Sequence, residues 1–216
     1  MDGEIDHRAT RRDFCSGTLS FTDLSANPWE QMARWLQDAE AAGNFDPTAM
    51  ALATADEHGQ PSVRFVLLKH FDERGICWYT DSRSQKGQDL AVNPKGAVVF
   101  YWPELDRQLR LAGAVELLPE QDAENYFQQR PLGSRLAAAA SIQSQPIANR
   151  ALLEARVQEL AQEFPDGKVP RNPAWRGYRL VPMSFEFWQG RRNRLHDRFR
   201  YLRSSEGSWR ITRLMP

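Results

Sequence analysis

The feature that most limits the possible folds is a run of short apolar segments separated by turns over residues 49–117. In the segment Leu105–Leu117, polar side chains at Gln108, Arg110 and Glu116 alternate with apolar ones at Leu109, Leu111, Val115 and Leu117. A period of two with one apolar face is typical of a half-buried antiparallel strand. Asp56–Gln60 and Asp72–Gly75 have the composition of turns between such strands. The pattern predicts a meander of antiparallel strands joined by hairpins.

Further elements are predicted from the same periodicities. Strands are expected at Ala49–Ala55, Val63–Phe71, Ile76–Thr80, Gly96–Trp102, Leu105–Leu117, Gly177–Trp188, Leu195–Leu202 and Trp209–Leu214. Helices are expected from Pro28 (capped by Asn27) to Gly43 and over Gln85–Val92, Pro119–Gln129, Leu132–Ala140 and Ile147–Phe164. Hairpin-linked strands with helices inserted late predict a mainly β antiparallel barrel with α additions. The chain has neither a Gly-x-Gly-x-x-Gly motif nor a P-loop motif, so neither nucleotide site is supported.

Composition narrows the class of protein. Apolar residues make up 41% and charged residues 26% of the 216, which argues against a disordered, collagen-like or disulfide-stapled chain. Residues 1–26 are polar and lack periodicity, so we expect a mobile N-terminal arm followed by a single domain over residues 27–216. The 28 basic residues balance the 28 acidic ones, which argues against a binder of nucleic acid or of membrane surfaces.

The cysteines and the N-terminus indicate the compartment. Cys15 and Cys77 are too far apart for a Cys-x-x-Cys motif, so we expect reduced thiols and no metal site. Residues 1–12 lack the apolar core of a secretory signal, and no apolar run is long enough to span a bilayer. These features predict a cytoplasmic protein.

Two cations, Arg64 and Lys69, interrupt an otherwise apolar predicted strand. Each needs an anion, because a buried unpaired cation is costly. Positions five apart face opposite sides of an ideal strand, so the two are expected to serve different anions. The alternative is that one or both reach water or pair with an internal carboxylate.

A second polar motif, Ser82–Gly87, follows a predicted strand and begins a predicted helix. Hydroxyl groups, a lysine and free backbone N–H groups at a helix N-terminus are suited to binding a phosphate. The alternative is an ordinary capped surface helix.

A third motif places Arg194, His196 and Arg198 on one face of a predicted strand by two-residue alternation. Such groups repel one another unless an anionic or π-rich partner lies opposite, and Trp188 just before them suggests an aromatic wall. The alternative is a charged face that protects an edge strand from aggregation.

A fourth motif combines a phenol, a guanidinium and a hydroxyl at a helix junction. Tyr126 and Arg130 are four residues apart and share a helix face, Pro131 ends that helix, and Ser134 starts the next. This set suits a phosphate monoester. A capping and packing junction is the alternative.

Several segments together form one distinctive constellation. They are Arg64–Lys69, Tyr79-Thr80, Ser84–Gly87, Arg107–Arg110, Tyr126–Pro131, Gln143-Ser144, Phe185–Gly190 and Arg194–Arg198. In this combination the chain resembles the pyridoxamine/pyridoxine 5′-phosphate oxidases, FMN flavoproteins of the split-barrel type. The likeness runs from residue 27 to the C-terminus and implies a six- to eight-stranded antiparallel split barrel with peripheral helices.

The resemblance implies a role for each motif. FMN would be held by Arg64, Phe65, Val66, Leu67, Leu68, Lys69, Tyr79, Thr80, Gln85, Lys86, Gln108, Gln143, Ser144, Trp188 and Arg198. The substrate phosphate would be held by Lys69, Tyr126, Arg130 and Ser134. Arg194, Leu195 and His196 would contact the substrate, with Arg194 and His196 as the catalytic groups over its pyridine ring.

The implied activity is oxidation of pyridoxamine 5′-phosphate and pyridoxine 5′-phosphate to pyridoxal 5′-phosphate, with O2 as acceptor and H2O2 released. The implied assembly is a homodimer with two sites at the subunit interface. Arg11–Phe14 resembles, more weakly, a segment that closes over the substrate. Gln85 stands where some members carry arginine, and Arg83 is expected to compensate for it.

Two other functions compete with this one. A sister flavin oxidase of the phenazine-biosynthesis type would not need the phosphate cluster of Tyr126, Arg130 and Ser134. A non-catalytic FMN-binding module would not need Arg194-Leu195-His196.

Overall fold

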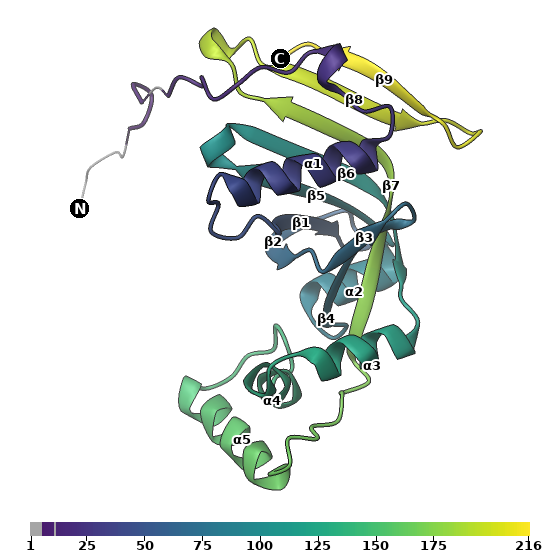
Figure 1. Cartoon of the computed structure of the whole chain (residues 1–216). Helices are drawn as coiled ribbons and strands as arrows, with labels where there is room; N and C mark the ends of the chain where they lie inside the picture. Colours follow the sequence, from purple (N-terminus) through teal and green to yellow (C-terminus); the bar gives the residue numbers. More distant parts are fainter. Residues whose placement is uncertain (1–5, 11) are drawn as a thin grey trace. The chain divides into compact units, whose positions relative to one another are not determined.

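The computed structural model describes residues 6–10 and 12–216, which form two compact units (Figure 1). Unit 1 consists of the described part of Met1–Pro47 with Phe100–Arg110 and Ser184–Pro216, and unit 2 of Thr48–Val99 and Leu111–Met183. Three strands, β5 (Lys95–Trp102), β6 (Arg107–Leu117) and β7 (Trp175–Gln189), have residues in both units. The boundary therefore falls inside continuous strands, and the single domain expected over residues 27–216 stays a prediction.

Seven of the strands follow one path whose two end strands, β2 and β3, both belong to unit 2. The order along this path is β2-β1-β5-β6-β7-β4-β3, with β1 at Ala49–Ala55, β2 at Pro61–Leu67, β3 at His70–Asp72 and β4 at Gly75–Asp81. The end strands β2 and β3 are separated along the chain only by Leu68 and Lys69. Because so short a connection reaches at most about 11 Å, the two ends of the sheet lie close together, as in a barrel.

The single strand predicted at Val63–Phe71 is wrong, because the chain changes partner within it. The backbone N–H of Leu68 donates to the carbonyl of Thr48 at 3.0 Å, whereas that of Lys69 donates to the carbonyl of Cys77 at 2.9 Å. The chain thus leaves β1 and joins β4 between two consecutive residues. The break raises the eight expected strands to nine in the described sheet, and the mainly antiparallel architecture is as predicted.

Unit 2 also contains four α-helices among its described residues. They are α2 (Gln85–Val92), α3 (Glu120–Gln129), α4 (Leu132–Ala140) and α5 (Arg150–Glu163), close to their predicted ranges. Helices α4 and α5 lie side by side (Figure 1) and share a small core of Leu136, Leu160 and Val169. No helix formed by the described residues has the length and apolar character needed to cross a membrane.

Unit 1 is built around an aromatic core. Asn27 caps α1 (Pro28–Ala41) by accepting the N–H of Trp29 at 3.0 Å, as predicted. The helix packs Trp29 against Phe185, with ring centroids 4.8 Å apart, and Trp35 against Phe187 at 5.0 Å. The remaining elements are the short helices η1 (Phe21–Asp23), η2 (Pro103–Leu105) and η3 (Arg192–Arg194) and the strands β8 (Asp197–Arg203) and β9 (Trp209–Leu214).

The predicted strand Leu195–Leu202 begins two residues late, at Asp197. Asn193 and Arg194 adopt left-handed backbone angles, with φ of 55° and 63°. A left-handed residue breaks the two-residue alternation of a strand. The prediction that Arg194, His196 and Arg198 share one strand face is therefore wrong.

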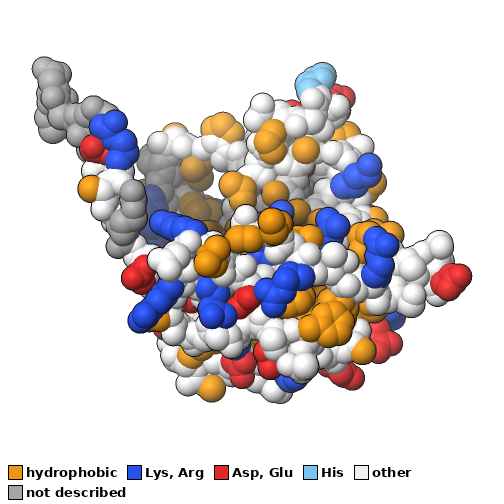
Figure 2. All heavy atoms as spheres, turned by 90° about the horizontal axis from the view of Figure 1, so that it is seen from above, with side chains coloured by type: hydrophobic (Ala, Val, Ile, Leu, Met, Phe, Trp, Pro, Cys, Tyr) orange, Lys and Arg blue, Asp and Glu red, His pale blue; other side chains and the backbone are white. Residues whose placement is uncertain are grey.

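Basic side chains are frequent on the face seen from above, where Lys and Arg are interspersed with hydrophobic residues (Figure 2). In β8 and β9, Arg200, Arg203 and Arg210 are exposed. Such a surface is consistent with the zero net charge of the chain, because acidic residues elsewhere balance it.

Candidate functional site

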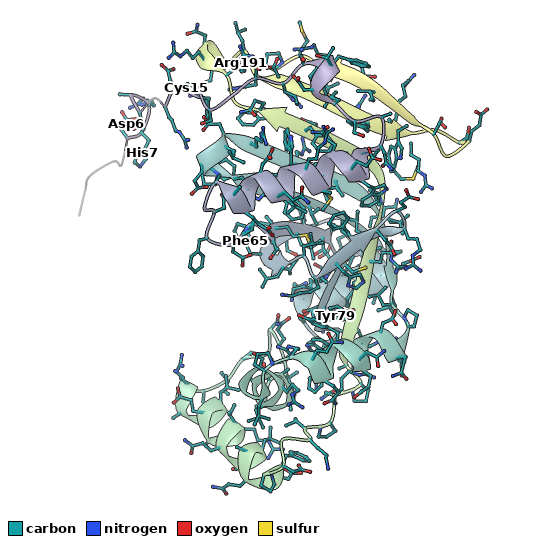
Figure 3. The ribbon with its side chains drawn as sticks, viewed as in Figure 1. Asp6, His7, Cys15, Phe65, Tyr79 and Arg191 are labelled. Atoms are coloured by element: carbon teal, nitrogen blue, oxygen red, sulfur yellow. The ribbon has the colours of Figure 1, made fainter. Side chains whose placement is uncertain are left out.

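Unit 2 contains a cleft of about 1020 Å³ lined by residues of β2, β4, α2, α3 and α4. Most predicted site residues of this unit line it: Arg64, Phe65, Val66, Leu67, Lys69, Tyr79, Thr80, Gln85, Lys86, Tyr126, Arg130, Ser134, Gln143 and Ser144. Phe65 on β2 and Tyr79 on β4 are labelled in Figure 3. Leu68 does not line the cleft and is buried in the core. Segments far apart in the sequence thus come together around one cavity.

Lys86 is a buried cation at the start of α2 with neutral neighbours. Its Nζ lies 3.2 Å from Thr80 Oγ1, 3.1 Å from Ser84 Oγ and 2.5 Å from Gln143 Oε1. Burial, and then the charge of Arg64, lower the pKa of Lys86 to about 8. A buried cation whose hydrogen-bond partners are neutral is suited to an incoming anion, and the backbone N–H groups of a helix start favour the same. The motif at 82–87 therefore has the donors of a phosphate cradle.

Arg64 is half-buried on β2 beside this cradle. Its Nη1 donates to Thr54 Oγ1 at 2.7 Å, and its Nη2 lies 3.8 Å from Asp89 Oδ2. Burial lowers the pKa of Arg64, against the opposing charge of Asp89. The internal carboxylate considered as an alternative partner is therefore present, although Arg64 also lines the cleft.

Arg83, which is expected to compensate for Gln85, is directed to a neighbouring carboxylate in this structure. Its guanidinium is paired with Asp81, with Nη2 2.7 Å from Oδ2, and also donates to the carbonyl of Ser141. It does not line the cleft, whereas Gln85 does. The motif alone did not reveal this ion pair with the carboxylate two residues earlier, and compensation by Arg83 in FMN binding stays a prediction.

The helix junction places a further cation, Arg130, in the same cleft. The Nη1 of Arg130 is buried and has no hydrogen-bond partner among the described residues. Its guanidinium carbon lies 5.0 Å from the ring centroid of Trp175, and burial lowers its pKa. Buried donors are almost always satisfied, so an orphan on a cleft wall points to an anionic ligand. Tyr126 and Ser134 line the cleft beside it.

An aromatic stack that the sequence analysis missed supports this junction. Tyr79 stacks on Tyr126 with ring centroids 4.3 Å apart and on Trp175 at 5.4 Å. Trp175 begins β7 after the linker that ends at Pro173, and nothing in the local pattern of the sequence linked it to Tyr126 or Arg130. The stack fixes the wall on which Arg130 lies.

In unit 1, the predicted catalytic residues His196 and Arg194 lie against the aromatic side chains of Trp188 and Phe14. The His196 ring lies 4.6 Å from Trp188 and 5.4 Å from Phe14, and the Arg194 guanidinium lies 5.9 Å from Phe14. The Nδ1 of His196 accepts the backbone N–H of Arg191 at 3.0 Å. Burial, and then the charges of Arg194 and Arg198, lower the pKa of His196. The lowered pKa favours the neutral imidazole, and a neutral ring whose Nδ1 accepts a hydrogen bond carries its proton on Nε2. The aromatic wall expected at Trp188 is present.

The other predicted cofactor residues of unit 1 are Gln108, Trp188 and Arg198. All three are half-buried, and Trp188 and Arg198 are register partners on β7 and β8. Arg198 is held by Glu186, with Nε and Nη2 at 2.9 and 2.7 Å from Oε1. Leu195, predicted to contact substrate, is 69% exposed.

The described part of the N-terminal arm is held to unit 1 by a buried carboxylate. Asp106 accepts hydrogen bonds from Arg12 Nη2 at 2.5 Å and from the backbone N–H groups of Cys15 and Ser16 at 3.2 Å. Phe14 thereby reaches Trp188, with ring centroids 5.6 Å apart. Arg11 lies outside the described residues. Mobility of the arm and its closure over a substrate stay predictions.

Comparison with known families agrees with these observations. Residues 29–164 match the family described as pyridoxamine 5′-phosphate oxidase, and residues 175–216 match the C-terminal dimerisation region of pyridoxine 5′-phosphate oxidase. The chain belongs to the pyridoxamine 5′-phosphate oxidase family. The family match therefore confirms the resemblance that the sequence motifs indicated.

Individual members of the pyridoxamine 5′-phosphate oxidase family match almost the whole chain. Pyridoxine/pyridoxamine 5′-phosphate oxidase from Ralstonia pickettii is 49% identical over 95% of this chain and 97% of its own length. The enzyme of that name from Trichormus variabilis is 47% identical over 95% of this chain and 96% of its own length.

Solved structures confirm the predicted split-barrel fold class. PhzG from Burkholderia lata, in complex with tetrahydrophenazine-1-carboxylic acid, has a TM-score of 0.85 and 33% identity, covering 90% of this chain and 95% of its own. A pyridoxamine 5′-phosphate oxidase-related, FMN-binding protein from Nostoc punctiforme has a TM-score of 0.72 over 89% of this chain and 100% of its own. At 20% identity, the latter likeness concerns the fold alone.

Proposed function

We propose that this protein oxidises pyridoxamine 5′-phosphate and pyridoxine 5′-phosphate to pyridoxal 5′-phosphate, with FMN as cofactor, O2 as acceptor and H2O2 as the second product. The observation that carries the proposal is that two cations of one cleft, the buried Lys86 and the half-buried Arg130, have no anionic hydrogen-bond partner among the described residues. Lys86 is buried among neutral oxygens, and Arg130 has an orphaned Nη1. A cofactor and a substrate that each carry a phosphate would supply those two anions.

The cradle at the start of α2 would hold the FMN phosphate. Lys86 and Arg64 supply positive charge, Thr80 and Ser144 supply hydroxyl groups, and Gln85 at the start of α2 also lines the cleft, with its backbone N–H 3.3 Å from Ser144 Oγ. A phosphate beside Lys86 would offset the cost of burying the lysine's positive charge, so the fit is electrostatic as well as steric. Gln143, which already holds Lys86 Nζ, would keep the lysine directed at the phosphate.

The junction between α3 and α4 would hold the substrate phosphate. Arg130 presents its unsatisfied Nη1, and Tyr126, Ser134 and Lys69 line the same cleft. The stack of Tyr79 on Tyr126 keeps the cleft wall at Arg130 rigid. Because each phosphate would have its own binding site, the substrate would be held by its phosphate, and the reacting carbon on its pyridine ring would be free to face the cofactor.

Bound FMN would accept a hydride from the substrate carbon that carries the amine or alcohol, and O2 would then take up the electrons. Arg194 and His196 would orient the substrate ring in the homodimer that the C-terminal region supports. Because Nδ1 of His196 accepts a hydrogen bond and its pKa is lowered, the ring would present an Nε2–H donor to the substrate rather than a cation. Arg194 would supply the fixed positive charge.

The test is anaerobic reduction of the purified, FMN-loaded protein. Pyridoxamine 5′-phosphate should bleach the flavin absorbance, and readmitted O2 should restore it with one H2O2 per pyridoxal 5′-phosphate. Pyridoxamine without the phosphate is the matched control and should react far more slowly, because it leaves Arg130 unpaired. The likeness to PhzG favours one competing function, and tetrahydrophenazine-1-carboxylic acid tests it. Bleaching by that compound alone would replace the proposal with the phenazine-type activity, and a protein that binds no FMN would end both.

A further inference from the structure

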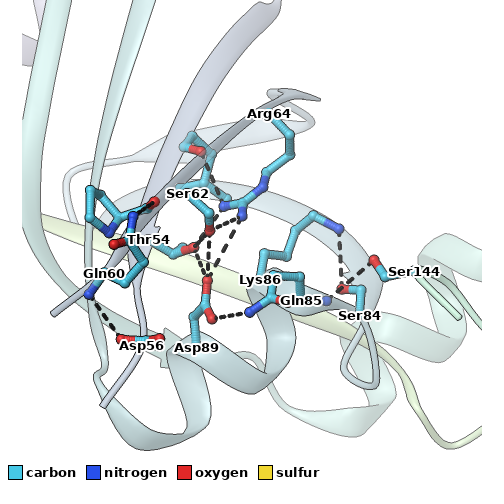
Figure 4. A network of polar contacts seen from close by, with 12 residues as sticks. Thr54, Asp56, Gln60, Ser62, Arg64, Ser84, Gln85, Lys86, Asp89 and Ser144 are labelled. Carbon is cyan, nitrogen blue, oxygen red and sulfur yellow. Dashed lines mark hydrogen bonds and ion pairs between the residues drawn. The ribbon is translucent and has the colours of Figure 1, made fainter. Parts of the chain in front are cut away.

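A buried carboxylate that no proposed role uses lies behind the phosphate cradle. Asp89, on α2, is 2% exposed and accepts hydrogen bonds from Thr54 Oγ1 at 2.5 Å and Ser62 Oγ at 2.9 Å (Figure 4). Its other oxygen accepts Gln85 Nε2 at 2.8 Å, and Arg64 Nη2 lies 3.8 Å away. Burial alone would raise the pKa of Asp89, but the hydrogen bonds from Thr54, Gln85 and Ser62 outweigh it and lower that pKa. Asp89 is therefore a buried carboxylate in which both side-chain oxygens accept hydrogen bonds from neighbouring side chains.

The carboxylate decides which way two hydroxyl groups face. A hydroxyl has a single proton, and Thr54 and Ser62 each direct theirs to Asp89. Only their lone pairs are then left for Arg64, which donates Nη1 to Thr54 and Nη2 to Ser62. Two hydrogen bonds of the Arg64 guanidinium thus go to acceptors that Asp89 orients, and Nη1 also donates to the carbonyl of Leu52 at 3.2 Å. Without the negative charge, either hydroxyl could turn its proton toward the guanidinium and lose the bond.

The same carboxylate also claims the side chain at position 85. Gln85 lines the cleft, yet its amide donates to Asp89 one helical turn away. Its backbone N–H lies 3.3 Å from Ser144 Oγ on the cleft wall. An arginine at position 85 would meet the same carboxylate and form an ion pair at i,i+4. The side chain at 85 is therefore directed away from an anion in the cradle by its neighbour, whatever its own charge.

We propose that Asp89 is a positioning residue of the cofactor's phosphate cradle: it aligns Arg64 through Thr54 and Ser62, and it withholds the side chain of residue 85 from the phosphate. The inference rests on the proposed binding of FMN. It assigns phosphate recognition in this chain to Arg64, Lys86 and the start of α2, with the side chain of Gln85 serving the network behind them.

The first measurement compares FMN with riboflavin, which has the same ring system and no phosphate. Dissociation constants are taken from flavin fluorescence with the full-length apoprotein. Asp89→Asn should weaken FMN about tenfold or more, the size expected for a lost charge-assisted hydrogen bond, and should leave riboflavin within about twofold. A merely structural role for Asp89 would weaken both flavins alike. Ser62→Ala, which removes one of the aligned hydroxyls, should lower the same selectivity more mildly, and it replaces Asp89→Asn if that variant is recovered unfolded.

The second measurement is a double-mutant cycle at positions 85 and 89. Gln85→Arg alone should change FMN affinity by less than about twofold, because Asp89 captures the new guanidinium. In the Asp89→Asn background, the same change should tighten FMN about tenfold, because the arginine is then free to reach the phosphate. Gln88→Arg is the matched control, since it adds the same charge to an exposed position of the same helix. It should have equal effects in both backgrounds.

Three outcomes would overturn the inference. Additive effects of Gln85→Arg and Asp89→Asn would show that Asp89 does not restrain position 85. Equal loss of FMN and riboflavin in both Asp89→Asn and Ser62→Ala would reduce the network to a folding role. A wild-type protein that binds neither flavin would overturn the proposed function as well, whereas the first two results leave that function intact.

Discussion

The buried Lys86 predicts a specific pH dependence of FMN binding. The cation is the form that attracts phosphate, and the pKa of Lys86 in the apoprotein is about 8, lowered by burial and by Arg64. Raising the pH from 7.5 to 9.5 therefore removes most of the charge before the ligand arrives. With one proton taken up on binding, the dissociation constant for FMN should rise about 25-fold across that range. The FMN phosphate itself is fully ionised throughout, because its second pKa is near 6.

The assay is fluorescence titration of the apoprotein with FMN at half-unit pH steps. Riboflavin is the first control, because it reports any ionisation of the flavin ring and does not contact Lys86 through a phosphate. Lys86→Arg is the second control, since a guanidinium keeps its charge to beyond pH 12 and should abolish the slope. A flat profile for the wild type, or an equal slope in Lys86→Arg, would refute the assignment of the cradle to Lys86.

The same group makes an opposite prediction for stability. The pKa of Lys86 is lower in the folded apoprotein than in the unfolded chain, so the unfolded chain binds more protons between about pH 8 and its ordinary value of 10.5. The contribution of Lys86 to the free energy of unfolding should therefore rise with pH over that window, while FMN affinity falls. Comparing denaturant unfolding of the wild type with that of Lys86→Met isolates this contribution.

Four substitutions test other parts of the structure. Arg130→Ala should lower kcat/KM for pyridoxamine 5′-phosphate about tenfold to a hundredfold, as for a lost charge-assisted contact, with little change in FMN affinity. Arg194→Ala should lower kcat/KM by about two orders of magnitude with FMN still bound, and activity near that of the wild type would remove it from the mechanism. Gly113→Ala places a Cβ 2.0 Å from the carbonyl oxygen of Val181, so the thermal midpoint should fall by an amount matching about 1–3 kcal/mol. Asp106→Asn keeps a side chain that tolerates the observed φ of 52° but removes the negative charge that binds the N-terminal arm. Limited proteolysis of the arm should therefore become faster, and an unchanged rate would show that Asp106 does not hold the arm.

Some of this structure follows from local patterns in the sequence. The cap at Asn27, the helices over 85–92 and 132–140, and the half-buried strand ending at Leu117 lie where periodicity and capping residues predicted them. The phosphate-type donors at 82–87 and 126–134 were also visible as motifs. These features depend on residues that are close together in the sequence, so local sequence patterns are enough to predict them.

Other features depend on contacts between distant segments. The apolar run from Val63 to Phe71 gave no sign that its pairing changes from β1 to β4 at Leu68, because both halves are equally suited to a strand. The left-handed turn at Arg194 was hidden behind an alternating pattern of charges. In both places, long-range pairing overrides what the local pattern favours.

By itself, the sequence determined the family motifs, the mainly antiparallel fold class and the candidate cations of the site. Only the tertiary structure decided where those cations lie: Arg83 is paired with Asp81 outside the cleft, whereas Lys86 lines the cleft among neutral oxygens and Arg130 lies on its aromatic wall with a donor unsatisfied. The physical reason is that the number and type of cations are set by composition, whereas their burial and their counterions are set by which remote segments fold against them.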